Sequence, residues 1–199
     1  MAPIHAAARR ADVAYFRRLL AAGVYPDALD ALDGGQHGLT PLMNLCEWTD
    51  RESDRVACFK LLREAGANLE ALSSPTANTV LHYAAISGCV GIMSLVIEAG
   101  VNVNVVNNDG LTPLAMAFSR RHRRMWPLLL RAGAEIPGYY IWNSSPDPYF
   151  IRVHRAGGFK KYAQQHLAAM TKLFAANGRR LPPEVVRQIM KFWLHLGCY

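Results

Sequence analysis

The chain has 199 residues, of which 51% are hydrophobic and 19% are charged, and this composition is that of a folded globular protein. It excludes a generally disordered chain, a collagen-like chain and a small module held together by disulfides. The four cysteines contain no C-x-x-C pair, so we expect reduced thiols in a reducing compartment, the cytoplasm, with the nucleus left open. They are Cys46, Cys58, Cys89 and Cys198.

The net charge of +7 is unevenly distributed along the chain. Residues 1–137 hold 13 basic and 13 acidic side chains, whereas residues 138–199 hold 9 and 2. The segment PGYYIWNSSPDPYF, rich in proline and aromatic residues, follows the point where the composition changes. This asymmetry predicts two unlike regions with a boundary at residue 137: a first domain, residues 1–137, and a basic helical C-terminal module, residues 138–199.

Two short motifs recur in the first region. A helix-start motif appears as APIH at 2–5, TPLM at 40–43, TVLH at 79–82 and TPLA at 112–115. A second motif, which ends in glycine, appears as LLAAG at 19–23, LLREAG at 61–66, VIEAG at 96–100 and LLRAG at 129–133. Their spacing gives a base period of 33 residues, with five residues inserted in the second unit and five in the first connection.

A period of 33 residues with T-P-L-H at the start of each unit resembles the ankyrin repeat, and the closest unit runs from Thr79 to Asn108. The resemblance implies an all-α solenoid of four helix-turn-helix repeats with hairpin loops over residues 1–137. The helix start and stop residues that follow predict a three-helix C-terminal cap or module. Met43 and Ala115 stand where the family has histidine, so we expect weaker polar bracing in those two repeats.

Local chemistry favours the same helices. Thr40 and Thr112 are placed to cap helices whose first positions are Pro41 and Pro113, where the missing N–H is harmless. The glycine of each second motif suits the left-handed residue after a helix. The residues before these glycines are expected in the core: Leu19, Leu20, Leu61, Leu62, Val96, Ile97, Leu129 and Leu130.

One uncharged stretch of 18 residues, Val80 to Ile97, has the length of a short membrane span. Ser87, Gly88 and Gly91 interrupt it near its middle, and His82 lies near its start. These residues favour two short helices joined by a turn, so we predict no transmembrane segment.

The sequence contains no arrangement typical of an enzyme. No Ser/His/Asp, Cys/His or paired-carboxylate spacing is recognisable, and there is no glycine-rich phosphate loop. His5 and His82 are interpreted as helix-bracing residues, because a metal site needs several converging ligands. We therefore predict a non-enzymatic protein, monomeric in isolation, with no cofactor and no metal.

The resemblance implies protein partners, bound on the concave face by the hairpin tips and the inner helix surface. Side chains at i and i+4 share a helix face, so the alignment gives an inner ladder. Its predicted partner-binding members are Asn44, Trp48, Tyr83, Ser87, Met116 and Arg120. Trp48 either anchors a partner or covers the neighbouring repeat. The third repeat adds a neutral face that also includes Ser73, Ser74, Asn107 and Asn108, which favours apolar or neutral contacts.

Three helices are predicted in the C-terminal module: Asp147–Ala156, Phe159–Ala176 and Pro182–Leu196. The last helix carries an apolar arc too wide for a solvated helix. Either this arc covers the last repeat as a cap, or it receives a partner. The predicted contact residues of the module are Leu167, Leu181, Val185, Ile189, Phe192 and Trp193.

Two resemblances give this module alternative meanings. Ankyrin repeats followed by such a tail resemble the ankyrin and SOCS-box proteins, substrate receptors of cullin–RING ubiquitin ligases. HLAAMTKLFA would then bind elongin through Leu167, and LPPEVVRQIMKF would select the cullin, although Thr171 replaces the usual cysteine. The pattern GGF…Y…H…LPPEV…FW…G-Y also resembles an uncharacterised tail of ankyrin proteins in single-celled eukaryotes, which implies no known activity.

The basic residues leave a third function open, the binding of nucleic acid or of an anionic surface. The module's lysines and arginines, together with the RRHRR segment at 120–124, are able to contact phosphates. No helix-turn-helix, zinc-finger or RNA-recognition signature accompanies them. We therefore rank this function below protein binding.

Overall fold

The computed structural model describes residues 3–28, 38–47, 50–142 and 147–176, together with Pro182, Glu184, Val185 and Gln188. It divides the chain into two compact units, residues 1–125 (unit 1) and residues 126–199 (unit 2). This division lies between the two helices of the fourth repeat, whereas the sequence predicts a boundary at residue 137.

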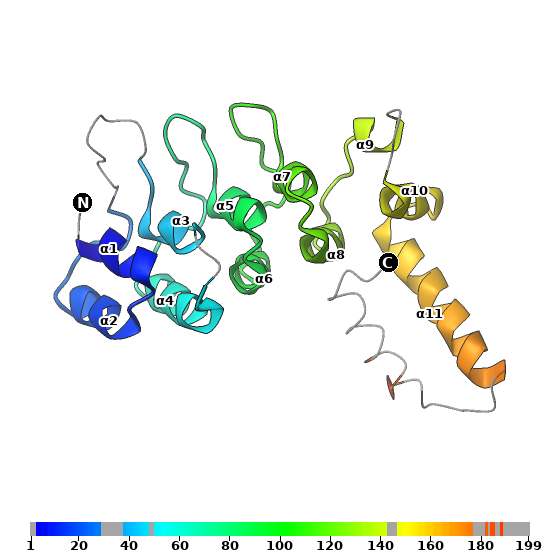
Figure 1. The fold of residues 1–199 in the computed structure, drawn as a ribbon, viewed down its shortest axis with the longest axis horizontal. Coiled ribbons are helices and arrows are strands. Elements are labelled where there is room, and N and C mark those ends of the chain that lie inside the picture. The colour runs from blue at the N-terminus through cyan, green and yellow to red at the C-terminus, as the bar shows by residue number, and fades with distance from the viewer. Residues whose placement is uncertain are drawn as a thin grey trace. The chain divides into compact units, whose positions relative to one another are not determined.

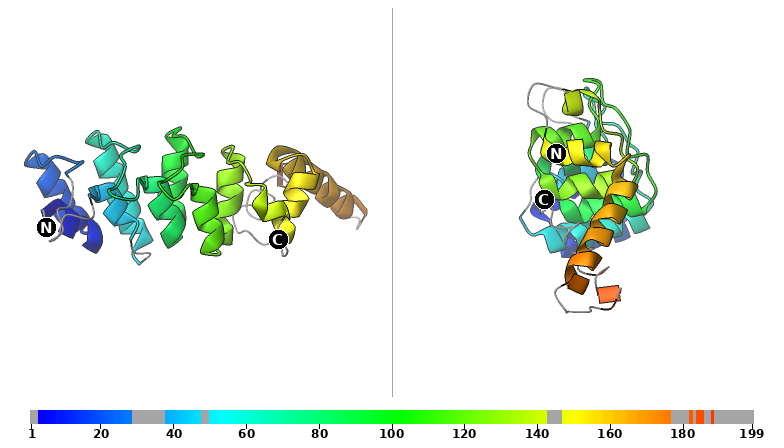
Figure 2. Two further views of the ribbon diagram at one scale, coloured as in Figure 1. Left: turned by 90° about the horizontal axis from the view of Figure 1, so that it is seen from above. Right: turned by 90° about the vertical axis from the view of Figure 1, so that its right-hand side faces the viewer.

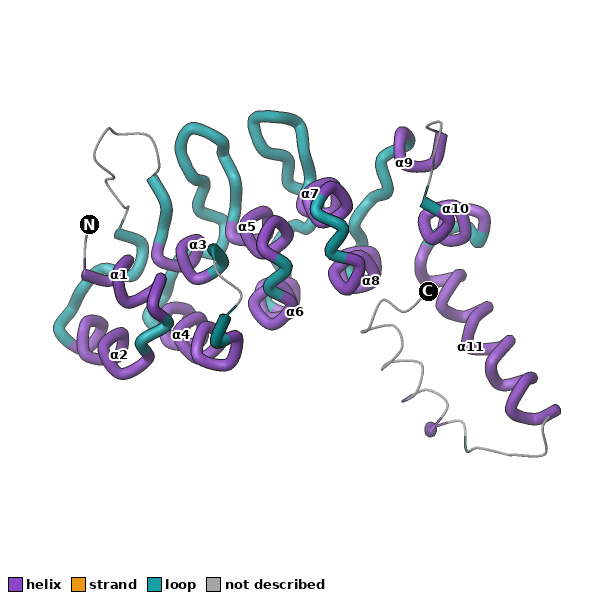
Figure 3. The backbone as a smooth tube through the Cα atoms, viewed as in Figure 1, coloured by secondary structure: helices purple, strands orange, loops and turns teal. Residues whose placement is uncertain are grey.

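Unit 1 consists of short helices that stack in chain order (Figure 1, Figure 2). The first helices of the repeats pack on one another, α1 on α3, α3 on α5 and α5 on α7, and the second helices do the same, α2 on α4 and α4 on α6. The described residues of the chain form helices and loops with no β-strand, which confirms the all-α fold class (Figure 3). The elements are α1 (Pro3–Arg10), α2 (Val13–Ala21), α3 (Pro41–Leu45), α4 (Glu52–Glu64), α5 (Val80–Ser87), α6 (Val90–Glu98), α7 (Pro113–Ser119) and the 3₁₀ turn η1 (Arg123–Met125).

The threonine caps form as the sequence predicts. The Thr40 hydroxyl accepts a hydrogen bond from the Met43 amide at 3.4 Å, and the Thr112 hydroxyl accepts one from the Ala115 amide at 3.2 Å. Proline occupies the first turn of both helices. The Met43 sulfur accepts a bond from the Thr40 amide at 3.4 Å, so a weak acceptor occupies the position where the third repeat has histidine.

His82 braces the third repeat, which confirms the role predicted for it. Its Nδ1 accepts a hydrogen bond from the Thr79 amide at 3.1 Å, and its Nε2 lies 3.0 Å from the Leu111 carbonyl oxygen. Because Nδ1 accepts, the proton of the neutral ring is on Nε2 and is donated to Leu111. One fully buried side chain therefore ties the start of α5 to the loop before α7.

This arrangement predicts how the stability of unit 1 depends on pH. Burial lowers the pKa of the His82 imidazole from its ordinary value of 6.5, and the bond to the Leu111 carbonyl opposes that shift. The folded state therefore favours the neutral ring. The stability that neutral His82 contributes is fully present above the unfolded-state pKa of about 6.5. This contribution is lost as the pH falls from that value through the lower folded-state pKa.

We expect His82→Gln to lower stability at neutral pH, but to lose less stability than the wild type on acidification to about pH 5.5, because glutamine does not titrate. Amide hydrogen exchange in α5 and α7, corrected for the intrinsic pH dependence of exchange, measures this for both proteins. An equal acid-induced loss of protection in the two proteins would contradict the assignment.

The predicted core is confirmed in part. Leu62, Val96, Leu129 and Leu130 are buried, whereas the other four predicted core residues, Leu19, Leu20, Leu61 and Ile97, are half-buried. The glycines after the second helices adopt the predicted left-handed conformation. Their φ angles are +78° at Gly23, +83° at Gly66, +81° at Gly100 and +96° at Gly133.

The uncharged stretch from Val80 to Ile97 forms α5 and α6 with a turn at Gly88 and Cys89, as predicted. In the part of the chain that the structure describes, no helix combines the length and the apolar character needed to cross a membrane.

The inserted residues of the second repeat lengthen the connection between its helices. The residues between α3 and α4 run from Cys46 to Arg51, whereas only Gly88 and Cys89 separate α5 from α6. The insertion also extends α4, which has 13 residues against nine in α6.

A buried arginine on α4 holds this connection in place. Only 1% of Arg55 is exposed. Its Nε donates to the Asp50 carbonyl at 2.8 Å, its Nη1 to the Leu45 carbonyl at 3.0 Å, and its Nη2 to the Arg9 carbonyl at 3.2 Å. Nη2 also pairs with the Asp50 carboxylate at 2.8 Å. The guanidinium thus joins the end of α1, the end of α3 and the inserted connection.

Unit 2 contains the second helix of the fourth repeat and the described part of the C-terminal module. Its helices are α8 (Trp126–Arg131), α9 (Tyr139–Trp142), α10 (Pro148–Arg155) and α11 (Phe159–Ala176). Asp147 caps α10 by accepting a hydrogen bond from the Tyr149 amide at 2.9 Å. The first two predicted helices of the module are confirmed, while the third, Pro182–Leu196, lies outside the described residues except at isolated positions.

An aromatic cluster forms the core of unit 2. The ring of Phe150, which is fully buried, lies 5.0 Å from the Trp126 ring and 5.9 Å from the Tyr140 ring, measured between centroids. The Tyr149 ring lies 5.9 Å from both Trp126 and Tyr162. Through these rings α10 covers α8, and α11 packs on both α8 and α10.

The sequence predicts that the final helix covers the last repeat with Phe192 and Trp193. Both residues lie outside the described part of the chain, so that assignment stays a prediction. Among the described residues, α10 packs on the last repeat helix through Tyr149 and Phe150, and α11 also packs on it.

Candidate protein-binding surface

The loop between α4 and α5 ends in a turn closed by its own hydrogen bonds. The Ser73 amide donates to the Asn78 carbonyl at 2.9 Å, and the Ala77 amide donates to the Ser73 carbonyl at 2.8 Å. The Ser73 hydroxyl lies 3.0 Å from the Thr76 hydroxyl and accepts from the Asn78 amide at 3.1 Å. The Tyr83 hydroxyl donates to the same Ser73 oxygen at 3.2 Å, which fixes the turn to α5.

Asn107 orders the loop between α6 and α7. Its side-chain oxygen accepts hydrogen bonds from the Asp109 amide at 3.0 Å and from the Leu111 amide at 2.8 Å. The backbone amide of Asn107 donates to the Leu111 carbonyl at 3.0 Å. A single buried asparagine therefore satisfies three backbone groups of the turn.

Three hydrogen bonds join these loops to each other, one of them from the Asn108 side-chain nitrogen to the Pro75 carbonyl. The Asn107 side-chain nitrogen donates to Oδ1 of Asn78 at 2.9 Å, and the Asn108 amide donates to the Thr76 carbonyl at 3.0 Å. The loop tips of neighbouring repeats therefore form one hydrogen-bonded surface. We call this surface the hairpin platform and define it as residues 72–78 and 106–110.

The structure brings together the five neutral residues that the sequence predicts as one face. Ser73, Ser74, Asn107 and Asn108 belong to the hairpin platform, and Tyr83 is bonded to it. Ser73 and Asn107 are buried, and their polar groups are bonded within the protein. Ser74 and Asn108 are exposed and Tyr83 is half-buried, so these three are the ones a partner can reach.

Two other predicted partner-binding residues lie inside unit 1. Asn44 is fully buried, its side-chain nitrogen is 2.8 Å from His5 Nδ1, and its oxygen accepts from Arg9 Nε at 3.1 Å. Met116 is 8% exposed. Because consecutive first helices pack on each other, these two side chains face a neighbouring repeat instead of solvent. Both side chains therefore serve the packing of the stack.

The remaining ladder positions differ in accessibility. Ser87 is half-buried and donates its hydroxyl proton to the Tyr83 carbonyl at 2.9 Å. Arg120 is exposed at the end of α7. Trp48 lies outside the described residues, so its two interpretations stay open.

Two exposed apolar residues of the platform are absent from the sequence prediction. The side chains of Leu72 and Val106 are 60% and 61% exposed. Each stands six residues after the glycine of its repeat, Gly66 or Gly100, and the same position is apolar in the other repeats. That recurrence is the sequence signal that could have identified them.

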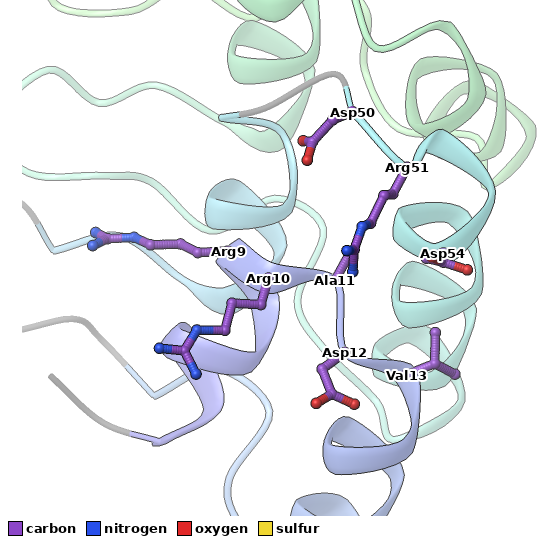
Figure 4. Close-up of a pocket in the computed structure, with 8 residues that line it drawn as sticks. All are labelled: Arg9, Arg10, Ala11, Asp12, Val13, Asp50, Arg51 and Asp54. Atoms are coloured by element: carbon purple, nitrogen blue, oxygen red, sulfur yellow. The ribbon is translucent and has the colours of Figure 1, made fainter.

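An open polar cleft of about 660 Å³ lies between the α1–α2 turn and the start of α4. In Figure 4, the side chain of Arg51, the residue just before α4, reaches toward this turn. Asp12 caps α2 by accepting from the Tyr15 amide at 2.9 Å, and Asp50 pairs with Arg55, so two of the carboxylates of the cleft serve the fold. Its lining residues are Arg9, Arg10, Ala11, Asp12, Val13, Asp50, Arg51 and Asp54.

The described cysteines are buried free thiols: Cys46, Cys58 and Cys89. Burial raises the pKa of all three, that of Cys58 to about 11, so they stay protonated at neutral pH. Within the described residues, no three His, Cys, Asp or Glu side chains form a group that could hold a metal ion.

The predicted contact residues of the C-terminal module are only partly described. Leu167 is half-buried on α11, and Val185 is 37% exposed. The other four, Leu181, Ile189, Phe192 and Trp193, lie outside the described residues.

Stacked pairs of short helices, joined by alternating short turns and long loops, define an all-α repeat solenoid. Residues 51–137 match the family model for ankyrin repeats (3 copies), so the chain contains ankyrin repeats. Such repeats imply protein–protein interaction, and the family is typically a non-enzymatic binding module.

Curated relatives share the repeat region. The protein named "Putative E3 ubiquitin-protein ligase XBAT31", from Arabidopsis thaliana, is 29% identical over 143 residues, which are 66% of this chain and 29% of that protein. E3 ubiquitin-protein ligase KEG, also from Arabidopsis thaliana, is 33% identical over 43% of this chain and 5% of its own length. The nuclear factor NF-kappa-B p105 subunit of Mus musculus is 34% identical over 42% of this chain and 9% of its own length. The chain spans less than a third of the length of these relatives.

Proposed function

We propose that this chain is a non-enzymatic adaptor that binds a partner protein through the inner side of its ankyrin stack, centred on the hairpin platform. The observation that carries the proposal is the set of three hydrogen bonds between neighbouring loops, from Asn107 to Asn78 and from Asn108 to Thr76 and Pro75. Loops already fixed in this way lose little conformational entropy when a partner binds.

The chemistry of the platform favours an apolar or uncharged partner segment. Leu72 and Val106 offer exposed apolar side chains, and Ser74 and Asn108 add neutral polar groups beside them. Side chains that are exposed on a rigid backbone and repeat from one unit to the next suit a partner that crosses several repeats.

The test uses the full chain as bait in an extract of the native source, with captured proteins quantified by mass spectrometry. We expect Leu72→Glu combined with Val106→Glu to reduce capture of the specific partner at least about tenfold, since burying two unpaired carboxylates is costly. Ala14→Glu combined with Ser53→Glu adds the same charge at exposed positions of α2 and α4 and should leave capture unchanged.

Circular dichroism must show that both double variants are folded. Capture that is equally strong with the platform variant would refute the choice of surface. Substitution of Met116 is unsuitable for this purpose, because a buried side chain reports on folding.

A second candidate function is that of a substrate receptor which recruits a cullin–RING ubiquitin ligase through the C-terminal module. It is supported by the names of two relatives, both E3 ubiquitin-protein ligases, although their similarity falls in the ankyrin region. Purified full chain should then bind elongin B–C at micromolar concentration, and Leu167→Asp should abolish the binding while the repeats stay folded. Absence of wild-type binding removes this candidate.

A further inference from the structure

Four arginines are gathered in one turn of unit 1, between the end of α7 and the end of η1. Arg120, Arg121, Arg123 and Arg124 are all exposed, and only His122 separates them. Because α7 begins at the loop that carries the hairpin platform, this turn lies at the opposite end of the helix.

The turn is held rigidly by its central residue. His122 Nε2 lies 2.9 Å from the Ile86 carbonyl oxygen, and its ring packs so closely over Gly88 that a Cβ there would come within 2.9 Å of it. The His122 amide donates to the Ala117 carbonyl at 2.9 Å, and Met125, at the end of the turn, is fully buried. The arginines are therefore presented from a fixed backbone.

Three of these four charges are not used in ion pairs within the described part of the fold. Among the described residues, no carboxylate forms an ion pair with Arg120, Arg121 or Arg124; the ion pairs found there are Arg9–Glu47 and Arg55–Asp50. Four cations within five residues repel one another, and that repulsion lowers stability unless an anion offsets it.

The backbone of Arg121 lies in the left-handed region, with φ +57°. Gly88 fills the corresponding turn of the third repeat with φ +81°, and Ala11 fills that of the first with φ +52°. A glycine would adopt this conformation without strain, and alanine shows that a small neutral side chain is enough. Arg121 therefore adopts a strained backbone conformation that glycine would relieve.

We propose that Arg120, Arg121, Arg123 and Arg124 bind an acidic peptide segment of a partner, one with closely spaced carboxylate or phosphate groups. Guanidinium groups form paired hydrogen bonds with both kinds of anion, which a lysine cluster cannot do. The site goes beyond the adaptor surface proposed above, and it shares only Arg120 with the inner ladder.

The charge of the rest of unit 1 favours a peptide over a nucleic acid or a membrane. Residues 1–125 hold 12 basic and 12 acidic side chains, so outside the four arginines the unit has 8 basic and 12 acidic side chains and is net negative. A long polyanion or a charged lipid surface would also meet the carboxylates of the unit, whereas a short acidic segment needs only the four arginines.

The experiment measures fluorescence anisotropy of labelled peptides with the full chain at low and at physiological salt. The probes are a peptide rich in Asp and Glu, a phosphoserine peptide of the same length, and an uncharged peptide of Asn, Gln and Ser. We expect one or both anionic peptides to bind and the uncharged peptide not to bind. Whichever of the two anionic peptides binds more tightly shows whether carboxylate or phosphate groups are the preferred anion.

Arg120→Gln, Arg121→Gln and Arg124→Gln together should raise the Kd for the anionic peptide at least about tenfold. The matched control replaces Arg17, Lys60 and Arg63 by Gln; these side chains are exposed elsewhere on unit 1, and the charge change is the same. The control should raise the Kd less than about threefold, the effect of net charge alone. Equal losses in the two variants would overturn the proposal.

Arg121→Gly separates a binding role from a structural one. It should raise the melting temperature, because it relieves the strained conformation, and it should weaken peptide binding. Unchanged binding would remove Arg121 from the site. Tighter binding of duplex DNA or of phosphatidylserine vesicles than of either acidic peptide, lost in the triple variant, would overturn the assignment of the partner.

Discussion

Arg55→Met is expected to destabilise unit 1 by about 3–5 kcal/mol, because it removes a buried guanidinium that donates to three backbone carbonyl groups. The guanidinium donates to the carbonyl oxygens of Asp50, Leu45 and Arg9. Methionine fills a similar space but leaves these acceptors without a donor, and each buried unsatisfied group costs about 1–3 kcal/mol. The inserted connection should therefore detach from α1 and α3.

Amide hydrogen exchange in the peptides of α1, α3 and α4 measures this effect without assuming that the two units unfold together. Arg63→Met is the matched control, since it makes the same substitution at an exposed position of the same helix. It should change stability by less than about 0.5 kcal/mol. Similar exchange rates in the two variants would show that Arg55 contributes no more than a surface charge.

Phe150→Ala should destabilise unit 2 by about 3–5 kcal/mol, because it leaves a cavity between α8, α9 and α10. The ring is fully buried and contacts Trp126 and Tyr140. Since α10 covers the last repeat helix through this ring, protection of the α8 amides should fall together with that of α10.

Phe150→Leu retains most of the buried volume and should cost about 1–1.5 kcal/mol. Arg152→Ala, at an exposed position of the same helix, should leave exchange nearly unchanged. If Phe150→Ala loosens α10 but leaves α8 as protected as in the wild type, then α10 does not cover the repeat helix.

Most of the fold could be predicted because its helices start and end with local signals. Thr40 with Pro41 and Thr112 with Pro113 depend only on neighbouring backbone groups, and so do the left-handed glycines. The repeat period then places each helix against its equivalent in the next repeat. Sequence reasoning of this kind succeeds where the interactions are short-range and repeated.

The unpredicted features depend on contacts between distant residues. Arg55 lies in a polar sequence typical of a solvated helix face, and its burial follows from acceptors up to 46 positions away. The repeat alignment and helix periodicity predict Asn44 on the partner-binding face, whereas its bond to His5 crosses from α3 to α1. Periodicity gives the face of a helix but does not give the partner of that face.

The candidate surface shows the same division. The sequence identifies Ser73, Ser74, Tyr83, Asn107 and Asn108 as neighbours, and the structure brings them together. The sequence does not reveal that the buried residues hold the platform in place, whereas the exposed residues are the ones available to a partner. That difference depends on the hydrogen bonds between the two loops.

Site-specific photocrosslinking tests the central claim, protein binding at the hairpin platform, most directly. A benzophenone amino acid is placed in the full chain at Leu72 or at Val106. A control protein carries it at Ala14, an exposed position of α2. Each protein is then irradiated in an extract of the native source. The account predicts that the same partner protein crosslinks from positions 72 and 106 and not from position 14. Crosslinking of that partner from position 14, or only from a residue of unit 2 such as Gln165, would contradict it.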